Sequence, residues 1–289
     1  DEFDLVDRRI RDVGAWEDCE MLPGLARAIG GKLRVLDAGA HIGACALPLA
    51  VAGHMVAAVE PHWRSFESLN ASVQFNRLAA AEGATSGLVE VHNVALTERR
   101  GHRLMWEKTR NSAASIALPE AQDPQDFVAR SGHTDPGVPA GIRQQMYANA
   151  SWAVAVPLDD LRIFGSRPPR AFDLVKLDVN GGELGLLRGA RLAFSVPPLI
   201  VKFEFWPSVL RAMDSDPLEL LRFFLERLYD LWVLDGGRGG MDTAYLLRDD
   251  GASLLNSTGA AFVERYTDIV AVSRLRWPAR SSLKETLAL

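Results

Sequence analysis

The chain has 289 residues, of which 48% are hydrophobic and 24% are charged, with a formal net charge of −5 and an isoelectric point near 5.7. This composition is typical of a globular protein, and we expect one domain over residues 1–289. The acidic balance argues against a nucleic-acid partner, and no apolar run reaches the ~18 residues that a membrane-spanning helix requires. We therefore predict a cytoplasmic protein without a membrane span; the sequence gives no oligomeric state.

The first 32 residues are polar and mixed, and they lead into a helix before the first predicted strand. Glu17 and Asp18 follow Trp16, and acidic residues are common at a helix start. An alternative is that residues 1–32 form a cover over the methionine end of the cofactor that the next segment indicates. Two cysteines are too few for a disulfide framework, and we interpret Cys45 as a small buried residue.

Residues 33–61 have the pattern of a βαβ unit. Two buried strands, residues 33–36 and 56–59, are separated by a glycine-rich turn and a helix. Glu60 follows the second strand, where a carboxylate can accept both hydroxyls of a ribose. The first strand is followed by Asp37, Gly39 and Gly43, at the sheet edge where open α/β sheets bind ligands.

The spacing of the glycines indicates which nucleotide-like ligand binds. A dinucleotide-binding turn requires Gly-x-Gly-x-x-Gly, but here Asp37 stands at the first glycine and Gly39-x-x-x-Gly43 follows. A carboxylate would repel a pyrophosphate and attract the amino group or sulfonium of S-adenosylmethionine (SAM). The pattern is typical of Rossmann-like methyltransferases. We therefore predict SAM as cofactor and S-adenosylhomocysteine (SAH) as product; the alternatives are a nicotinamide or flavin cofactor, or a turn that only packs tightly.

The next predicted elements complete the cofactor side of the site. Pro61 begins a helix over residues 61–78, and residues 89–91 form a third strand. The loop after that strand contains Asn93, Val94 and Ala95 and is expected to face the adenine. Asn93 either pairs with the edge of the base or serves as an ordinary turn residue.

Residues 101–108 alternate as a strand, and residues 109–150 then carry many turn signals with little periodicity. A loop of this length is far longer than usual, so we interpret it as a substrate lid or insert. It offers several side chains to an acceptor, and none can be singled out: Arg110, His133, Arg143 and Tyr147.

The remaining chain alternates strands and helices. Predicted strands cover residues 152–161, 174–177, 199–203, 231–234 and 269–273, with helices over residues 184–194 and 223–229. Seven of the predicted strands, with helices between them, favour a three-layer α/β/α sandwich around a seven-stranded, mostly parallel sheet. Asp178, Asn180 and Glu183 follow the fourth strand of that sheet, which places them beside the methyl group of the cofactor. Glu204 stands at the end of the fifth strand.

Five segments resemble, in chain order, the blocks of the FkbM family of SAM-dependent methyltransferases: VLDAGAHIG, VEPHWRSFESLNASVQFN, VHNVALTERRG, VPLDDL and VKLDVNGGELGLLRGA. The resemblance covers residues 35–204, and the C-terminal helix–strand–strand also fits. It implies the strand order 3-2-1-4-5-7-6 with the last strand antiparallel. It also implies methyl transfer to a hydroxyl of a small molecule, a sugar or glycolipid, or a polyketide-type natural product.

Two residues depart from the family pattern. His41 stands where the family usually has Asn; it can still donate to the cofactor, with a charge that depends on pH. Asn180 stands where the family usually has Glu, and an amide cannot act as a base. Any acid–base work would therefore fall to Asp178, Glu183 or Glu204.

Methyl transfer to an aliphatic hydroxyl requires positioning of the acceptor and removal of its proton. Asp178 is our first candidate for the base; the alternative is that it only holds backbone amides or Lys176. Glu183 is also explained as a first-turn helix acid, and Glu204 either orients the substrate or pairs with Lys202. No His-rich or Cys-rich cluster supports a metal site, so a divalent metal between Asp178 and Glu204 is a lesser alternative. Other hypotheses are a methyltransferase acting on a macromolecule and a non-catalytic SAM-binding scaffold protein.

Overall fold

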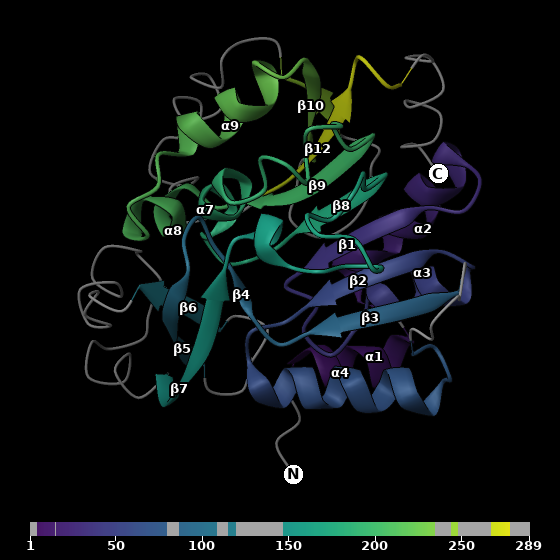
Figure 1. Cartoon of the computed structure of the whole chain (residues 1–289), viewed down its shortest axis with the longest axis vertical. Coiled ribbons are helices and arrows are strands. Elements are labelled where there is room, and N and C mark those ends of the chain that lie inside the picture. The colour runs from purple at the N-terminus through teal and green to yellow at the C-terminus, as the bar shows by residue number, and fades with distance from the viewer. Residues whose placement is uncertain are drawn as a thin grey trace.

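The computed structural model describes residues 5–14, 16–79, 87–108, 115–119, 147–234, 244–247 and 267–277. Within them an eight-stranded sheet runs in the order β11-β10-β12-β9-β8-β1-β2-β3 (Figure 1). Its strands are β1 (Arg34–Ala38), β2 (Met55–Val59), β3 (Leu88–His92), β8 (Leu174–Leu177), β9 (Ile200–Phe205), β10 (Tyr229–Leu234), β11 (Tyr245–Leu246) and β12 (Thr267–Ser273).

The sheet is sandwiched between two layers of helices, as the alternation of side chains along β1 requires. Val35 packs on one face with α2 (Glu17–Ile29), α3 (Ala46–Val51) and α4 (Trp63–Phe75), and a short α1 (Leu5–Val13) precedes α2. Leu36 and Ala38 pack on the other face, which is covered by α7 (Glu183–Arg188), α8 (Pro207–Ala212) and α9 (Pro217–Leu225). Both faces of the central strands are buried, as is typical of parallel strands in α/β folds.

Seven strands of the main sheet follow the expected order 3-2-1-4-5-7-6 when they are numbered along the chain: β3, β2, β1, β8, β9, β12 and β10. The predicted count of seven is wrong, because the short β11 adds an eighth strand beyond β10. The sheet is mixed, since β12 runs antiparallel to both β9 and β10, and β11 runs antiparallel to β10. The fold is therefore an α/β methyltransferase-like sandwich with an antiparallel edge.

A second sheet, which the sequence did not predict, has four strands in the order β4-β7-β5-β6. Its strands are β4 (Ala95–Leu96), β5 (Gly101–Lys108), β6 (Ile116–Pro119) and β7 (Tyr147–Val156). The strand over residues 101–108 is confirmed. The prediction of one long irregular loop over residues 109–150 is wrong, because β6 and the start of β7 lie within it.

Several predicted boundaries shift for identifiable reasons. The strand over residues 152–161 ends at Val156, and a short 3-10 helix (Leu158–Asp160) follows. α7 ends at Arg188, and Gly189 is its C-cap. Only glycine fits at that position, because a Cβ there would lie 2.1 Å from the Thr97 carbonyl oxygen. α9 lies earlier than predicted, because its N-cap is Asp216.

Candidate active site

Register brings the predicted site residues to one edge of the main sheet. Ala38 at the end of β1 pairs with Val59 of β2 on one side and with Leu177 of β8 on the other, all in parallel. The next residues along these strands are Gly39, Glu60 and Asp178. The carboxyl ends of three adjacent strands therefore converge, at the edge where such sheets bind ligands.

A cavity of about 250 Å³ lies over this edge. Six of the nine residues predicted to bind the cofactor line it: Gly39, His41, Glu60, Pro61, Val94 and Ala95. Asp178 and Asn180 line it as well, whereas Asp37, Gly43, Asn93, Glu183 and Glu204 do not. A second wall comes from β5 and β6 of the small sheet, and a third from Val6, Trp16 and Cys19 of the N-terminal segment.

The turn after β1 requires glycine at position 39. Gly39 has φ +80°, and its amide and that of Ala40 donate to the Val59 carbonyl, at 2.9 and 3.1 Å. A Cβ at Gly39 would lie 1.7 Å from the carbonyl oxygen of Asp178, so the two backbone segments are in contact. Gly43 is explained by packing instead, because a Cβ there would lie 2.6 Å from Leu69 of α4.

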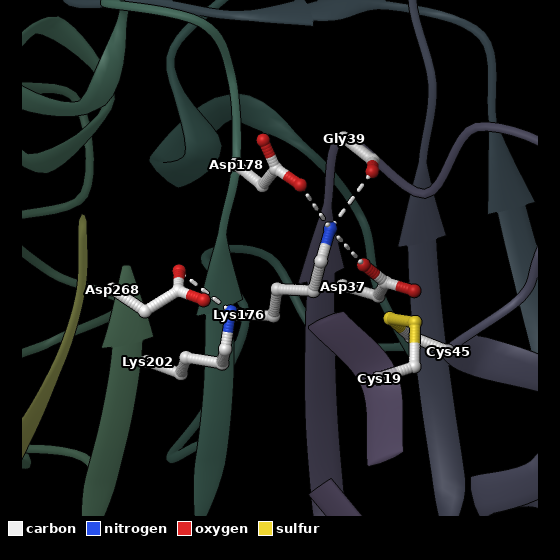
Figure 2. Close-up of a disulfide and its surroundings, with 8 residues drawn as sticks. All are labelled: Cys19, Asp37, Gly39, Cys45, Lys176, Asp178, Lys202 and Asp268. Carbon is white, nitrogen blue, oxygen red and sulfur yellow. Dashed lines mark hydrogen bonds and ion pairs between the residues drawn. A yellow bond between two sulfur atoms is a disulfide. The ribbon is translucent and has the colours of Figure 1, made fainter. Parts of the chain in front are cut away.

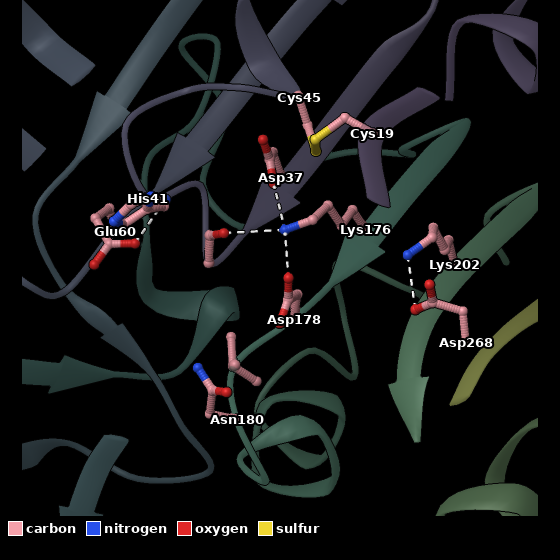
Figure 3. Close-up of polar contacts among 12 residues, drawn as sticks. Cys19, Asp37, His41, Cys45, Glu60, Lys176, Asp178, Asn180, Lys202 and Asp268 are labelled. Atoms are coloured by element: carbon pink, nitrogen blue, oxygen red, sulfur yellow. Dashed lines mark hydrogen bonds and ion pairs between the residues drawn. A yellow bond between two sulfur atoms is a disulfide. The ribbon is translucent and has the colours of Figure 1, made fainter. Parts of the chain in front are cut away.

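Glu60 is buried, and backbone amides hold its carboxylate in place. His41 N donates to Oε2 and His62 N donates to Oε1, each at 2.8 Å (Figure 3 shows the His41 contact). Burial raises the pKa of Glu60 to about 7, although both hydrogen bonds favour the ionised form. The side chain is thus fixed at the cavity wall and titrates near neutral pH.

Asn93 supports the backbone that follows β2 rather than lining the cavity. Its Nδ2 donates to the carbonyl oxygens of Glu60 at 2.8 Å and of Pro61 at 3.1 Å. The amide therefore positions the two residues that do line the cavity. Its predicted pairing with a base edge stays a prediction.

The centre of the site is the buried ammonium of Lys176 on β8 (Figure 2). Its Nζ lies 3.3 Å from Asp37 Oδ1 and 3.2 Å from Asp178 Oδ2, and it donates to the Gly39 carbonyl at 3.0 Å. Asp37 is 1% exposed and does not line the cavity, whereas the Asp178 side chain lines it and keeps 30% exposure. One lysine thus joins the glycine turn to the proposed base.

The charge state of this cluster follows from its neighbours. Burial alone would lower the pKa of Lys176, but Asp178 and Asp37 together raise it well above its usual range. Burial raises the pKa of Asp37, and Lys176 opposes that shift. Lys176 is therefore a permanent cation at neutral pH, and Asp178 faces the cavity with one oxygen held by it.

Glu183 is the first residue of α7, which confirms the alternative interpretation as a first-turn helix acid, whereas Glu204 lies elsewhere than expected. Glu183 is 1% exposed, and its Oε1 accepts hydrogen bonds from Val179 N at 3.1 Å and Gly181 N at 3.3 Å, so it shapes the loop after β8. Burial raises its pKa to about 7. Glu204 lies inside β9 rather than after it, and the predicted partner Lys202 binds Asp268 instead, at 2.7 Å (Figure 3).

The two departures from the family pattern share a backbone conformation. His41 and Asn180 both have φ 49°, the left-handed region that asparagine tolerates better than most residues. Asn180 Nδ2 also donates to the Ser115 carbonyl at 3.1 Å and so connects the loop after β8 to the small sheet. This contact gives Asn180 a structural role that a glutamate, which has no donor when ionised, would not fill.

Cys45 is not a simple buried residue, because it forms a disulfide with Cys19, with a Cα–Cα distance of 5.0 Å. The bond joins α2 to the residue before α3. Three candidates from the long loop, Arg110, His133 and Arg143, lie outside the described residues, as does the side chain of Tyr147.

A family model for the methyltransferase FkbM domain matches residues 37–231. The chain belongs to the FkbM methyltransferase family. A comparison with curated proteins finds no match. Among the residues that the structure describes, this FkbM-family chain has no helix long and apolar enough to cross a membrane, and no three His, Cys, Asp or Glu residues gather where they could hold a metal ion.

Solved structures similar to this FkbM-family chain include two methyltransferases. The FkbM methyltransferase from Methylobacillus flagellatus KT is 16% identical with a TM-score of 0.44; the match covers 83% of this chain and 43% of that one. Magnesium protoporphyrin IX methyltransferase from Synechocystis PCC 6803, solved with bound SAM, is 13% identical with a TM-score of 0.42, over 93% of this chain and 84% of that one. The chain thus spans less than half the length of the first of these proteins.

Replacing Lys176 with methionine is expected to lower the free energy of unfolding by about 3–5 kcal/mol, because it leaves the buried carboxylate of Asp37 without its counter-ion. Urea denaturation measures the change. The double variant Asp37→Asn/Lys176→Met is the control and should regain part of the loss. Equal stability of wild type and K176M would contradict this account of the cluster.

Proposed function

We propose that this chain is a SAM-dependent O-methyltransferase that acts on a hydroxyl of a small molecule, a sugar or glycolipid, or a polyketide-type natural product and releases SAH. The observation that carries the proposal is the convergence of Gly39, Glu60 and Asp178 at one cavity. The family supports methyl transfer, and the hydroxyl acceptor rests on the presence of a cavity-facing carboxylate.

The residues around the cavity fit SAM. Gly39 lines the cavity at the turn that brings β1 against the backbone of Asp178, and Glu60 offers a fixed carboxylate for ribose hydroxyls. Val94 and Ala95 provide an apolar surface suited to an adenine ring. Asp37 acts indirectly, by holding Lys176 beneath the turn.

When bound, SAM would supply a methyl group on a sulfonium, the electrophile of the reaction. In our proposal Asp178 takes the proton from the acceptor hydroxyl and so raises its nucleophilicity. Lys176 fixes one carboxylate oxygen of Asp178, which leaves the other to face the cavity. Asn180 and the small sheet would hold the acceptor side of the site, since Asn180 bonds directly to Ser115.

The proposed function is tested by incubating the protein with methyl-labelled SAM and a panel of hydroxylated acceptors. The panel contains sugars, glycolipids and polyketide-type compounds, each with a matched analogue in which a hydrogen replaces the hydroxyl. We expect label transfer and SAH release with a hydroxylated acceptor and none with its analogue. Transfer that is equal for the analogue would contradict O-methylation.

Binding of SAM is expected to tighten by about tenfold between about pH 6 and about pH 8, since the pKa of Glu60 is raised to about 7. Only the ionised carboxylate accepts hydrogen bonds from both ribose hydroxyls. Calorimetric titration across this range measures the effect. Glu60→Gln is the control and should bind weakly with little dependence on pH; a wild-type affinity that does not change would contradict the ribose contact.

Stability of the ligand-free protein should move in the opposite direction with pH. The pKa values of Glu60 and Glu183 are raised from 4.5 to about 7, so the folded state binds these protons more tightly than the unfolded chain. Their stabilising contribution is complete below about pH 4.5 and is lost as the pH rises through about 7. Urea denaturation over this range separates this effect from ligand binding.

A further inference from the structure

Both cysteines of the Cys19–Cys45 disulfide line the cavity, and Figure 2 shows the bond near Asp37 and Lys176. Cys19 belongs to the first turn of α2, and Cys45 directly precedes α3, two residues after Gly43. These are the only two cysteines of the chain. The bond therefore connects the N-terminal segment covalently to the end of the turn that follows β1.

The first turn of α2 is weakly joined to the rest of its helix. Pro23 lies inside α2, four residues after Cys19, and proline has no N–H to donate to the Cys19 carbonyl. Beyond that point Leu25 and Ala26 are 1% exposed and anchor the helix in the core. The helix ladder is thus interrupted at the residue that carries the disulfide.

The segment ahead of Pro23 forms part of the cavity. Val6 of α1, Trp16 and Cys19 all line it, as do Gly39 and His41 of the glycine turn. A ligand that fills the cavity would therefore lie against this wall. The disulfide fixes the distance between the wall and the turn.

We propose that the Cys19–Cys45 disulfide is a reversible redox site that exchanges with dithiol reductants and controls how fast the cofactor enters and leaves. The identity of that cofactor as SAM or SAH rests on the proposed function. In the oxidised protein the N-terminal wall is held against the turn; in the reduced protein the wall moves away more often. Regulation of this kind acts on cofactor exchange and leaves Asp178 unchanged.

The chemistry balances with a dithiol as the reductant. One reductant thiolate attacks a sulfur of the disulfide, forms a mixed disulfide and releases the other cysteine as a thiolate, which takes up a proton. The second reductant thiol then displaces the remaining cysteine and becomes the oxidised product. Two electrons and two protons pass from the reductant to Cys19 and Cys45.

Occupancy of the cavity should protect the bond in return. Cys19 is 7% exposed and Cys45 5%, so the reductant must reach them when the wall opens. A ligand that keeps the wall closed lowers the population of the open state. We therefore expect saturating SAH to slow reduction by dithiothreitol several-fold, measured by trapping free thiols over time.

The proposal is tested on wild-type protein, oxidised and reduced with dithiothreitol, and on the Cys19→Ser/Cys45→Ser variant. Amide hydrogen exchange of residues 5–22 and the dissociation rate of SAH are measured for each. We expect reduction of the disulfide to speed amide hydrogen exchange in this segment about tenfold and to leave the exchange rates of β1 and β2 unchanged. SAH dissociation should become faster by a similar factor. The variant should match the reduced protein and should not respond to dithiothreitol.

The outcomes separate the redox site from the proposed function. If the rates of amide hydrogen exchange and of SAH dissociation are the same in oxidised and reduced protein, the redox site alone is overturned. An absence of SAH binding in every form would overturn the proposed function, while the hydrogen exchange would still decide whether the disulfide holds the N-terminal wall. Reduced wild type covers the case in which the serine variant fails to fold.

Discussion

Replacing Gly39 with alanine is expected to abolish detectable SAM binding and to lower the free energy of unfolding by about 2–5 kcal/mol. The new Cβ would lie 1.7 Å from the carbonyl oxygen of Asp178, and the φ of +80° disfavours any side chain. The turn and the loop after β8 must separate to relieve the overlap. That movement would also displace Lys176, which bonds to the Gly39 carbonyl.

Gly53→Ala is the matched control for this substitution. Gly53 has φ +97°, and a Cβ there would meet nothing within 4 Å. It therefore carries the backbone penalty without the overlap, and we expect a loss of about 1–2 kcal/mol with unchanged SAM affinity. Urea denaturation and calorimetric titration measure both variants. Equal losses in G39A and G53A would contradict the close approach of the turn to Asp178.

Asp178→Asn is expected to lower the turnover number by about 10²–10⁴-fold, the usual contribution of general acid–base catalysis. The amide keeps the shape of the side chain but cannot accept the proton of the acceptor. Lys176 retains its contacts with Asp37 and with the Gly39 carbonyl, so SAM affinity should change little. Steady-state kinetics together with calorimetric titration would show loss of turnover with binding retained.

Asp214→Asn is the control for the loss of a cavity carboxylate. Asp214 lines the same cavity and follows α8, so it belongs to another part of the chain than the glycine turn. Its φ of 54° suits asparagine. We expect its turnover to stay within a few-fold of wild type. Full activity of D178N would show that Asp178 is not the base and would leave it the role of a partner for Lys176.

The part of the site that is local in sequence could be predicted. Gly39 and Glu60 belong to one βαβ unit, so a turn signal and two buried strands were enough to bring them to the same edge. The strand order followed from the resemblance to the family. His41 and Asn180 were recognised as departures, although their shared left-handed backbone is visible only in the structure.

The rest depends on contacts between distant segments. Cys19 and Cys45 are separated by 26 positions, and no local pattern indicates that α2 folds back onto the glycine turn. The sequence predicted β5 and part of β7, but the sheet that they form was missed because its short strands β4 and β6 were not predicted, and β4 pairs with β7 roughly sixty residues later. Short strands that pair across such distances leave little trace in the sequence.

The partners of two buried carboxylates could not be predicted from the sequence. Asp37 is buried against Lys176 of the neighbouring strand and does not line the cavity. Glu183 turns back to accept two backbone amides of its own loop. The sequence shows that both residues follow strands, but only the tertiary structure shows which neighbour each carboxylate binds.

Calorimetric titration of the oxidised protein with SAM, and separately with NADH, tests the central claim most directly. We predict micromolar binding of SAM and no binding of NADH, since Glu60 offers a carboxylate to a ribose and the turn after β1 lacks the Gly-x-Gly-x-x-Gly spacing of a pyrophosphate site. Glu60→Ala should remove most of the SAM signal. Binding of NADH with none of SAM would contradict the assignment of this cavity to a methyl donor.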